Sequence, residues 1–237
     1  EPAGSDPAST AETVSGTIQI IALDQPASVA VNGTIVTAVG QTITTPLGLI
    51  TITSIAPGAV GYSYTLTDNS TNPAASDIVT ITVTDRDGDA ATGTLTLTVL
   101  DDAPVARADR EDVAPNTYSA QTGNVITGQG TASGSAGADT QGADSATVTG
   151  IRSATAIAFS PSGAAIEGAY GRLLIQPDGS YSYTRNAGTP GGVNDVFTYT
   201  FSDGDTDTDA ATLTIQIGNS VPTLGDIPAA GGADTQV

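Results

Sequence analysis

Apolar and polar residues alternate with a period of two along several short segments of the chain. In residues 94–99, Leu95, Leu97 and Val99 fall on one face of an extended backbone and threonines fall on the other. The segments TITV (80–83), TYTF (198–201) and TLTIQI (212–217) show the same alternation. This period is typical of half-buried strands, and Thr and Val favour strands. Because no segment shows a helical period, the pattern predicts an all-β protein.

The alternating segments recur as part of a long internal repeat. Residues 61–104 and 180–222 both contain YSYT, a polar loop that ends in Asp, an alternating segment, an Asp-rich turn, a second alternating segment and a Pro. Asp85 and Asp203 are 118 residues apart, and so are Pro104 and Pro222. A repeat of this length has the size of a domain, and it predicts two homologous domains in tandem.

Turn-forming residues divide each domain into short elements. Clusters of Gly, Pro, Asn and Asp recur about every eight to twelve residues, and PDGS (177–180) predicts a hairpin between RLLIQ and YSYT. This spacing favours a β-sandwich of about seven strands in each domain. We place the domains at 1–103 and 104–220, with 221–237 as the start of a next repeat or a disordered tail. Residues 127–144 are rich in Gly, Ser and Ala, which predicts a long surface loop or local disorder.

The charge and the missing residue types exclude several functions. The net charge is -19, from 25 acidic and 6 basic residues, so nucleic acid and anionic membranes are not expected partners. No apolar run has the length of a membrane span. The chain has no Cys, His, Met or Trp, which removes thiol chemistry and the usual zinc and copper ligands. No apolar patch argues for an obligate oligomer, so we expect a monomer.

An enzyme is not expected from this composition. Without His, Cys or Lys, catalysis would depend on carboxylates or on activated hydroxyl groups. A carboxylate pair acting on a sugar would need a cleft, usually with aromatic platforms. The seven Tyr and three Phe are few, and most of them lie in the alternating segments.

The aspartates suggest a cation. Asp203, Asp205, Asp207 and Asp209 occupy every second position in one turn, and Asp85, Asp87 and Asp89 do the same in the other repeat. Carboxylates this close repel one another, whereas a bound Ca²⁺ accepts six to eight oxygens in loose geometry. Neither segment fits an EF-hand, because the positions for its Gly and its bidentate Glu hold other residues. Solvated Asx turns are the alternative interpretation.

The predicted topology places these turns at a domain junction. In a sandwich, the turn before the last strand lies at the end where the chain enters, which is where the linker LDDAPVARADR would arrive. The polar loop of the first domain, with Asp68, Asn69 and Asp77, should lie at that domain's exit end. We therefore predict interdomain calcium that stiffens the tandem. The candidate ligands are Asp77, Asp85, Asp87, Asp89, Asp101, Asp102, Asp109, Asp203, Asp205, Asp207 and Asp209.

Several segments carry a resemblance to a known family. GNVITGQGTASGSAGADTQGADSATVTGI, GAYGRLLIQPDGSYSYT and DVFTYTFSDGDTDTDAATLTI resemble the VCBS repeat of giant RTX-type bacterial surface adhesins. The first domain, with VSGTIQI and TVTDRDGDAATGTLTLTVLDDAP, resembles the Ig-like repeat that alternates with it. The turn DGDTDTD departs from the usual DGDGD at Thr206, and the next junction begins with Asn219 rather than Asp. There is no GGxGxD run.

The resemblance implies both a fold and a function. It implies two tandem Ig-like or cadherin-like β-sandwiches that extend a bacterial surface adhesin, with neighbouring repeats of the same chain as partners. It also implies type I secretion to the extracellular cell surface, adhesion or biofilm formation, and Ca²⁺ at the domain junctions. No cleavable signal is visible in EPAGSDPAST, so we expect a piece of a larger protein or export without such a signal.

A ligand-binding module remains the alternative. Rows of Thr at residues 80, 82 and 84 and at residues 94, 96 and 98 could form a flat face for carbohydrate or ice. Alternating Thr also marks the solvent face of an ordinary sheet. An extender should become stiffer when calcium binds. A ligand-binding module should bind its ligand and show no calcium-dependent stiffness.

Overall fold

A computed structural model describes residues 12–21, 27–67, 75–100 and 102–224. These residues form two β-sandwiches, and the only helical element among them is a 3₁₀ turn, η1 (Gly134–Ala136). The predicted all-β fold is therefore confirmed. Within the same residues, no helix is long and apolar enough to cross a membrane.

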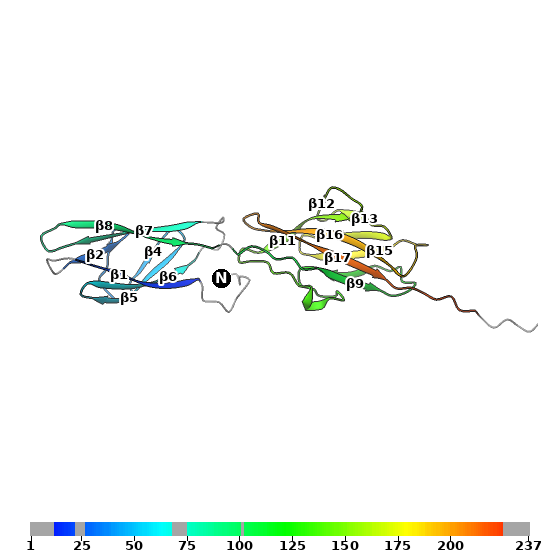
Figure 1. Cartoon of the computed structure of the whole chain (residues 1–237), viewed down its shortest axis with the longest axis horizontal. Helices are drawn as coiled ribbons and strands as arrows, with labels where there is room; N and C mark the ends of the chain where they lie inside the picture. Colours follow the sequence, from blue (N-terminus) through cyan, green and yellow to red (C-terminus); the bar gives the residue numbers. More distant parts are fainter. Residues whose placement is uncertain (1–11, 22–26, 68–74, 101, 225–237) are drawn as a thin grey trace, which may run out of the picture. The chain divides into compact units, whose positions relative to one another are not determined.

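The N-terminal sandwich packs two four-stranded antiparallel sheets against each other (Figure 1). The sheet orders are β1-β6-β5-β4 and β3-β2-β7-β8. The strands are β1 (Thr13–Gln19), β2 (Ser28–Val31), β3 (Thr34–Ile35), β4 (Thr42–Thr44), β5 (Gly48–Ala56), β6 (Ala59–Leu66), β7 (Ser76–Thr84) and β8 (Ala90–Thr98).

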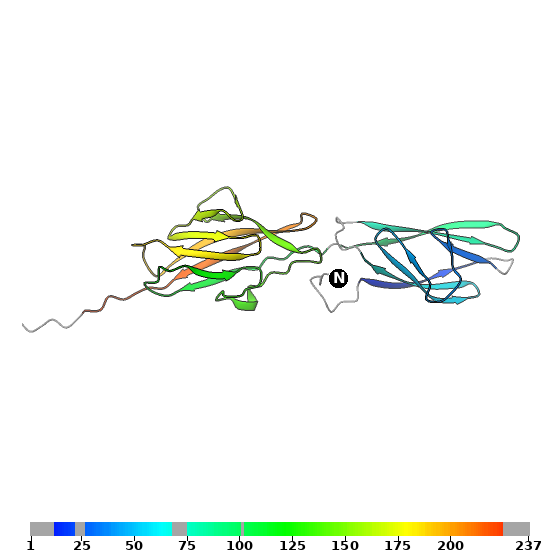
Figure 2. The same ribbon diagram turned by 180° about the vertical axis from the view of Figure 1, so that it is seen from behind.

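The C-terminal sandwich has a four-stranded sheet, β10-β15-β14-β13, and a five-stranded sheet, β12-β11-β16-β17-β9. Figure 2 shows both from the opposite side. The strands are β9 (Asp109–Val113), β10 (Gln121–Asn124), β11 (Ala146–Ser153), β12 (Ser160–Pro161), β13 (Ala165–Glu167), β14 (Gly171–Ile175), β15 (Ser180–Arg185), β16 (Val193–Asp203) and β17 (Thr208–Ile217). The predicted hairpin is confirmed, because β14 and β15 pair around a turn in which Gly179 has a φ of 79°.

The two sandwiches correspond strand by strand. Reading the sheet orders side by side matches β1, β6, β5 and β4 with β10, β15, β14 and β13, and β3, β2, β7 and β8 with β12, β11, β16 and β17. Only β9, which pairs in parallel with β17, has no counterpart in the described part of the N-terminal sandwich. The sequence predicted about seven strands for each domain, and the structure has eight and nine. The difference arises from strands as short as two residues, which carry no alternation.

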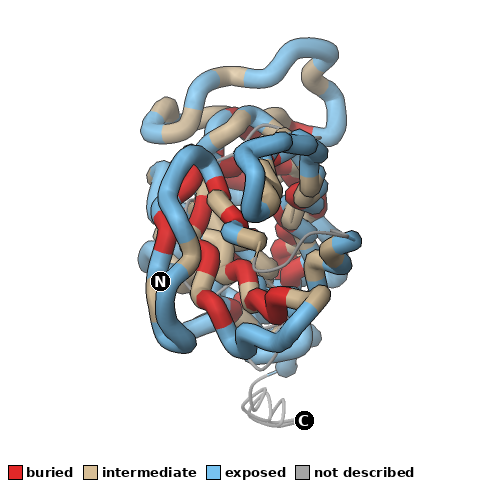
Figure 3. The backbone as a smooth tube through the Cα atoms, turned by 90° about the vertical axis from the view of Figure 1, so that its left-hand side faces the viewer, coloured by how far each residue is buried: buried red, intermediate tan, exposed pale blue. Residues whose placement is uncertain are grey.

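Each sandwich buries alternate residues of its strands. Figure 3 marks the buried residues along the chain in red. The N-terminal core consists of Val29, Val31, Ile43, Ile50, Ile52, Val60, Tyr62, Tyr64 and Val79. The C-terminal core contains more aromatic side chains, including Phe197, Tyr199 and Phe201, and the rings of Tyr183 and Phe197 meet edge to face at 6.1 Å. Aromatic packing of this kind adds to the stabilisation from burial.

The Gly- and Ser-rich segment before β11 forms a surface loop along β9. The amide of Ala132 donates to the carbonyl of Arg110 at 2.7 Å, and the amide of Arg110 donates to Ser133 Oγ at 2.7 Å. These bonds satisfy backbone groups on the outer edge of β9, which no further strand of the described chain pairs. The same segment continues to Asp144, which lies close to the β16–β17 turn.

Candidate cation site

The two Asp-rich turns, β7–β8 and β16–β17, have the same backbone hydrogen bonds. Asp85 Oδ1 accepts from the amide of Asp89 at 2.9 Å, and Asp203 Oδ1 accepts from the amide of Asp207 at 2.8 Å. The amides of Asp85 and Asp203 in turn donate to the carbonyls of those same partners. The first aspartate of each turn therefore closes the turn, as an Asx residue does.

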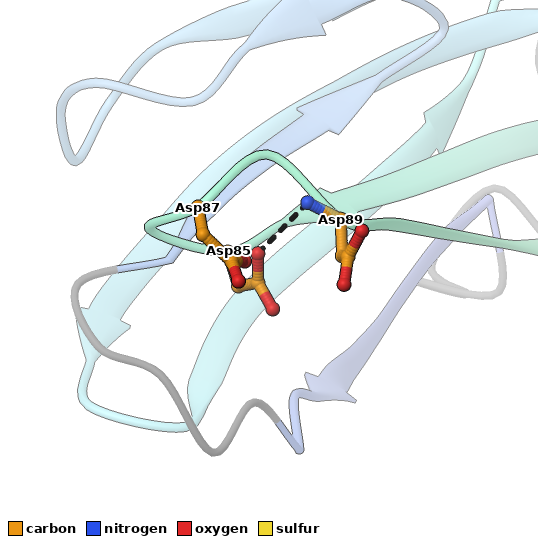
Figure 4. Close-up of side chains that lie close together, drawn as sticks. All are labelled: Asp85, Asp87 and Asp89. Atoms are coloured by element: carbon orange, nitrogen blue, oxygen red, sulfur yellow. Dashed lines mark hydrogen bonds between the residues drawn. The ribbon is translucent and has the colours of Figure 1, made fainter.

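The turn of the N-terminal sandwich gathers three aspartates at the surface (Figure 4). One carboxylate oxygen from each of Asp85, Asp87 and Asp89 lies within 4.8 Å of the others. Hydrogen bonding and charge from Asp87, together with slight burial, raise the pKa of Asp85. Asp87 and Asp89 are exposed, so water can solvate these charges.

The corresponding turn of the C-terminal sandwich belongs to a more enclosed group, which we call the Asp144 cluster. It consists of Asp144, Asp203 and Asp205, and one carboxylate oxygen from each lies within 4.8 Å of the others. Asp203 ends β16, Asp205 lies in the turn, and Asp144 comes from the loop that precedes β11. The amide of Asp205 donates to Asp144 Oδ2 at 2.9 Å, which fixes the loop against the turn.

Glycine at position 204 leaves room for this contact. A Cβ on Gly204 would lie 2.8 Å from Asp144 Oδ2 and 3.2 Å from the Asp144 carbonyl oxygen. Contacts this short would push the loop away from the turn. The absence of a side chain at Gly204 therefore lets Asp144 approach.

Three carboxylate oxygens of the Asp144 cluster are buried without a hydrogen-bond donor. Asp203 is 9% exposed, and its Oδ2 has no hydrogen-bond partner. Both carboxylate oxygens of Asp205 are also buried and without a partner. Burial, and then the proximity of the Asp205 and Asp144 carboxylates, raise the pKa of Asp203 to about 6. Buried carboxylates are normally paired or bound to a metal, so this arrangement is unfavourable for the protein alone.

A hard divalent cation fits this donor set. Calcium binds oxygens at roughly 2.3–2.6 Å, so two of its ligands lie at most about 5 Å apart, which matches the spacing in the cluster. Three carboxylates supply three to six oxygens, and backbone carbonyls or water could complete the usual six to eight. Because all the donors are carboxylate oxygens, the site favours Ca²⁺ or Mg²⁺ over zinc or copper.

Two residues beside the cluster have backbone conformations that side chains rarely adopt. Thr206 has a φ of 85° and Ser145 has a φ of 67°. The residue 118 positions before Thr206 is Gly88, whose φ is 101°. The turn therefore requires a positive φ at this position, and the C-terminal sandwich meets the requirement with a β-branched residue.

Asp77, a predicted ligand, has a different place. It is buried in the N-terminal sandwich, where its Oδ2 accepts hydrogen bonds from Thr45 Oγ1, from the Leu47 amide at 3.2 Å and from the Tyr64 hydroxyl at 3.0 Å. It thus joins the β4–β5 loop to β6 and is not part of either Asp group.

Asp195 occupies the equivalent place in the C-terminal sandwich. It accepts from the amides of Ala169 and Tyr170, both at 2.9 Å, and from the Tyr183 hydroxyl at 3.1 Å. We call each of these arrangements a carboxylate latch: Asp77 with Tyr64, and Asp195 with Tyr183.

The remaining predicted ligands are dispersed. Asp209 Oδ2 accepts from the amide of Ala106 at 2.9 Å, and it holds the chain that enters the C-terminal sandwich at the start of β17. Asp109 is buried on β9 opposite Leu213. Asp102 and Asp207 belong to neither group, and Asp101 lies outside the described residues.

Asp144 is the residue that the sequence did not identify. It lies in a segment that has no counterpart in the first repeat, so the repeat comparison gave no reason to select it. The only local signal was the presence of two acidic residues, Asp139 and Asp144, in a segment that is otherwise uncharged.

A family model decides what kind of domain this is. The model of the bacterial cadherin-like domain matches residues 101–219, just over half of the chain. The chain belongs to the bacterial cadherin-like domain family. Cadherin-like domains are adhesion-type modules of extracellular proteins, and they generally bind Ca²⁺. The match includes the whole Asp144 cluster and the segment that enters the C-terminal sandwich.

Solved structures resemble the cadherin-like chain only distantly. Extracellular cadherin domains 3–6 of protocadherin gamma B2 share 12% identity over 87% of this chain and 51% of that one, with a TM-score of 0.33. A bradyzoite-specific antigen of Toxoplasma gondii shares 10% over 87% of both chains, with a TM-score of 0.38. An endo-fucoidan hydrolase of glycoside hydrolase family 107 shares 13% over 88% of this chain, with a TM-score of 0.30.

The chain spans about a quarter of that hydrolase and about a third of a second one from the same family. No curated protein matches the chain.

Proposed function

We propose that this cadherin-like chain is an extender segment of a bacterial surface adhesin, and that Ca²⁺ bound by Asp144, Asp203 and Asp205 stiffens the entry to its C-terminal sandwich. The observation that carries the proposal is the burial of three carboxylate oxygens that have no donor. A cation would convert their mutual repulsion into attraction and would lower the raised pKa of Asp203.

The surrounding contacts connect this site to the entering chain. Asp209 holds Ala106, and Val105 forms a bridge with Thr140 in the loop that continues to Asp144. A cation in the Asp144 cluster would fix that loop against the β16–β17 turn. Val105 and Ala106 would then be held between the fixed loop and Asp209. The chain before these residues would have less freedom to bend.

The wider biological setting is also a proposal. The resemblance to VCBS and Ig-like repeats of RTX-type adhesins supports secretion by a type I system, a place on the bacterial surface, and a role in spacing an adhesive tip from the cell during adhesion or biofilm formation. The partners would be neighbouring repeats of the same chain.

The first test is thermal unfolding with and without calcium. Chelator-treated protein should gain several degrees in melting temperature on addition of millimolar Ca²⁺, since binding to the folded state alone stabilises it by RT ln(1 + [L]/Kd). Small-angle scattering should show a narrower distribution of chain dimensions in calcium than in chelator.

Matched variants make the test specific. Asp144→Asn should abolish most of the calcium-dependent rise, whereas Asp112→Asn, which changes an exposed aspartate paired with Arg110, should retain it. An unchanged melting temperature and scattering curve in the parent protein would refute the calcium site. A calcium response that Asp144→Asn leaves intact would move the site elsewhere.

A further inference from the structure

The hairpin of β11 and β12 has a longer loop than its counterpart in the N-terminal sandwich. Strands β2 and β3 are joined by Asn32 and Gly33 alone, whose φ values of 45° and 77° suit the tightest hairpin turn. In the C-terminal sandwich, the innermost pair is Ile151–Ser160, so the loop consists of residues 152–159. Because two residues are enough to close the counterpart, the fold does not require the extra length.

The 152–159 loop exposes apolar side chains. Its sequence is RSATAIAF, in which Arg152 is the only charged residue. Ile157 is 96% exposed and Phe159 is 42% exposed, and the alanines of the loop lie among them. Exposed apolar side chains that gather in one place indicate an interaction surface, whereas the same residues scattered singly do not. The additional length of the loop therefore serves to present a surface.

Arg152 adds a positive charge to this surface. Its guanidinium stacks over the Phe159 ring, with 4.9 Å between Cζ and the ring centroid. Its Nη1 donates to the Ala156 carbonyl at 3.5 Å, which is long for a hydrogen bond, and its Nε is buried without an acceptor. No carboxylate among the described residues forms an ion pair with it. The ring therefore holds the guanidinium in place, and its capacity to bind an anion is unused within the described chain.

Charge and composition together indicate the kind of ligand. Arginine binds carboxylates through a planar pair of N–H groups, so an acidic group fits beside Phe159. The net charge of -19 repels acidic groups from most of the chain, and this loop is a place that attracts one. Apart from Arg152, the exposed side chains of the loop offer one hydroxyl, that of Thr155. Binding of a sugar depends on many polar contacts, whereas an apolar protein segment needs few. The loop therefore suits a protein.

We propose that the 152–159 loop docks a partner protein through an apolar segment that carries an aspartate or a glutamate. The carboxylate pairs with Arg152, and apolar side chains beside it pack on Ile157 and Phe159. Aromatic residues and arginine are enriched among the side chains that supply most of the binding energy at interfaces. The loop adjoins β12, which is an edge strand of the five-stranded sheet (Figure 1). The surface is separate from the proposed calcium site and does not depend on it.

Peptide selection tests the proposal with a defined probe. A phage-displayed library of random peptides, about twelve residues long, is selected on the immobilised chain in about 150 mM NaCl, where salt screens the repulsion from the net charge. The selected peptides should contain Asp or Glu next to large apolar residues. Their dissociation constants, measured by calorimetry with synthetic peptides, should be the same in calcium and in chelator. This equality distinguishes the loop from the Asp144 cluster.

Matched variants locate the binding on the loop. Arg152→Gln and Ile157→Ser should each weaken peptide binding by at least about tenfold, as the loss of a central contact does. Arg172→Gln, which removes an exposed arginine from β14, and Ile78→Ser, which removes an exposed isoleucine from β7, should leave binding unchanged. Ile157→Ser should melt within about 2 °C of the parent, because the side chain that it removes is 96% exposed.

Four outcomes would overturn the proposal. Selected peptides that bind Arg152→Gln and Ile157→Ser as tightly as the parent would place the binding elsewhere. Recovery of no peptide with a dissociation constant below about 1 mM would show that the loop has no useful affinity for such segments. A fall of several degrees in the melting temperature of Ile157→Ser would give the loop a structural role instead. Oligogalacturonate and phosphatidylcholine vesicles are further probes, and binding of either that Ile157→Ser abolishes would assign the surface to a sugar or to a lipid.

Discussion

One residue outside the repeat distinguishes the two Asp-rich turns. Asp85 and Asp203 accept the same backbone hydrogen bond in the same kind of turn. Asp85 remains with exposed neighbours, whereas Asp203 is covered by a loop that contributes Asp144. The turns themselves could be predicted, because alternating aspartates are a local pattern. The proximity of Asp144 to Asp203 could not be predicted from the sequence, because 59 residues and several strands separate the two.

Thr206 should be a source of strain at this turn. The backbone there has a positive φ that the other repeat satisfies with Gly88. Thr206→Gly should therefore raise the free energy of unfolding of calcium-free protein by about 1 kcal/mol, measured by urea denaturation. The reciprocal change, Gly88→Thr, should lower it by a similar amount. A loss of stability in Thr206→Gly would show that the threonine side chain makes a stabilising contact that outweighs the strain.

Asp203 should make the calcium-free protein sensitive to pH. Its pKa is raised from 3.8 to about 6. Between these two pH values the folded state therefore binds more protons than the unfolded state. Stability should therefore be highest below about pH 4 for this group and should fall as the pH rises through about 6. Asp203→Asn removes the charge, and at pH 7 in chelator it should be more stable than the parent by roughly 1–3 kcal/mol.

Saturating calcium should make the parent protein more stable than Asp203→Asn. The parent gains stability from the cation, whereas Asp203→Asn has lost a ligand and should gain little. Asp112→Asn serves as the control, because Asp112 is half exposed and pairs with Arg110 at the surface. If Asp203→Asn were less stable than the parent in chelator, the charge on Asp203 would be stabilising in the folded state, which would contradict the burial of its Oδ2 without a donor.

At the scale of elements, the carboxylate latches hold each sandwich together. Each joins a loop that precedes one strand to a tyrosine on the next strand of the sheet, through three hydrogen bonds to one aspartate. Hydrogen bonds to a buried charged group contribute more than neutral ones. The latches explain why both repeats contain an Asp at the end of the polar loop after YSYT.

Removal of a latch should destabilise the protein regardless of calcium. Asp195→Ala and Asp77→Ala should each lower the free energy of unfolding by roughly 3 kcal/mol, because they leave the tyrosine hydroxyl and one or two backbone amides without an acceptor. Thermal unfolding in chelator and in calcium measures the effect. For Asp77→Ala the loss should be equal in the two conditions. A loss that appears only in calcium would make Asp77 a cation ligand, as the sequence first indicated.

Strand β9 could not be predicted from the pattern of apolar and polar residues. Its sequence, DREDV, directs Asp109 and Glu111 inward, so it lacks the apolar alternation of the other strands. The Tyr181 hydroxyl donates to Glu111 Oε2 at 2.6 Å, and burial raises the pKa of this glutamate. The partner that makes β9 a strand lies about a hundred residues later, in β17. The hairpin around Gly179 could be predicted because its turn and both of its strands are adjacent in the sequence.

For the whole molecule, the main electrostatic feature is the net charge of -19, in which 25 acidic residues face 6 arginines. Self-repulsion of this size opposes the compact state and is screened by salt. Raising NaCl from about 10 mM to about 200 mM should increase the melting temperature of calcium-free protein by a few degrees. The increase should be smaller in saturating calcium. A melting temperature that falls with salt would show that attractive ion pairs dominate.

The parallel pair formed by β9 and β17 has a mechanical consequence. These are the first and last strands of the C-terminal sandwich, and five residues of each face one another in register. A pull on the two ends of this domain would drag the strands past each other, so the hydrogen bonds between them would bear the load together rather than break one after another. The chain would therefore transmit tension through its C-terminal sandwich by shear.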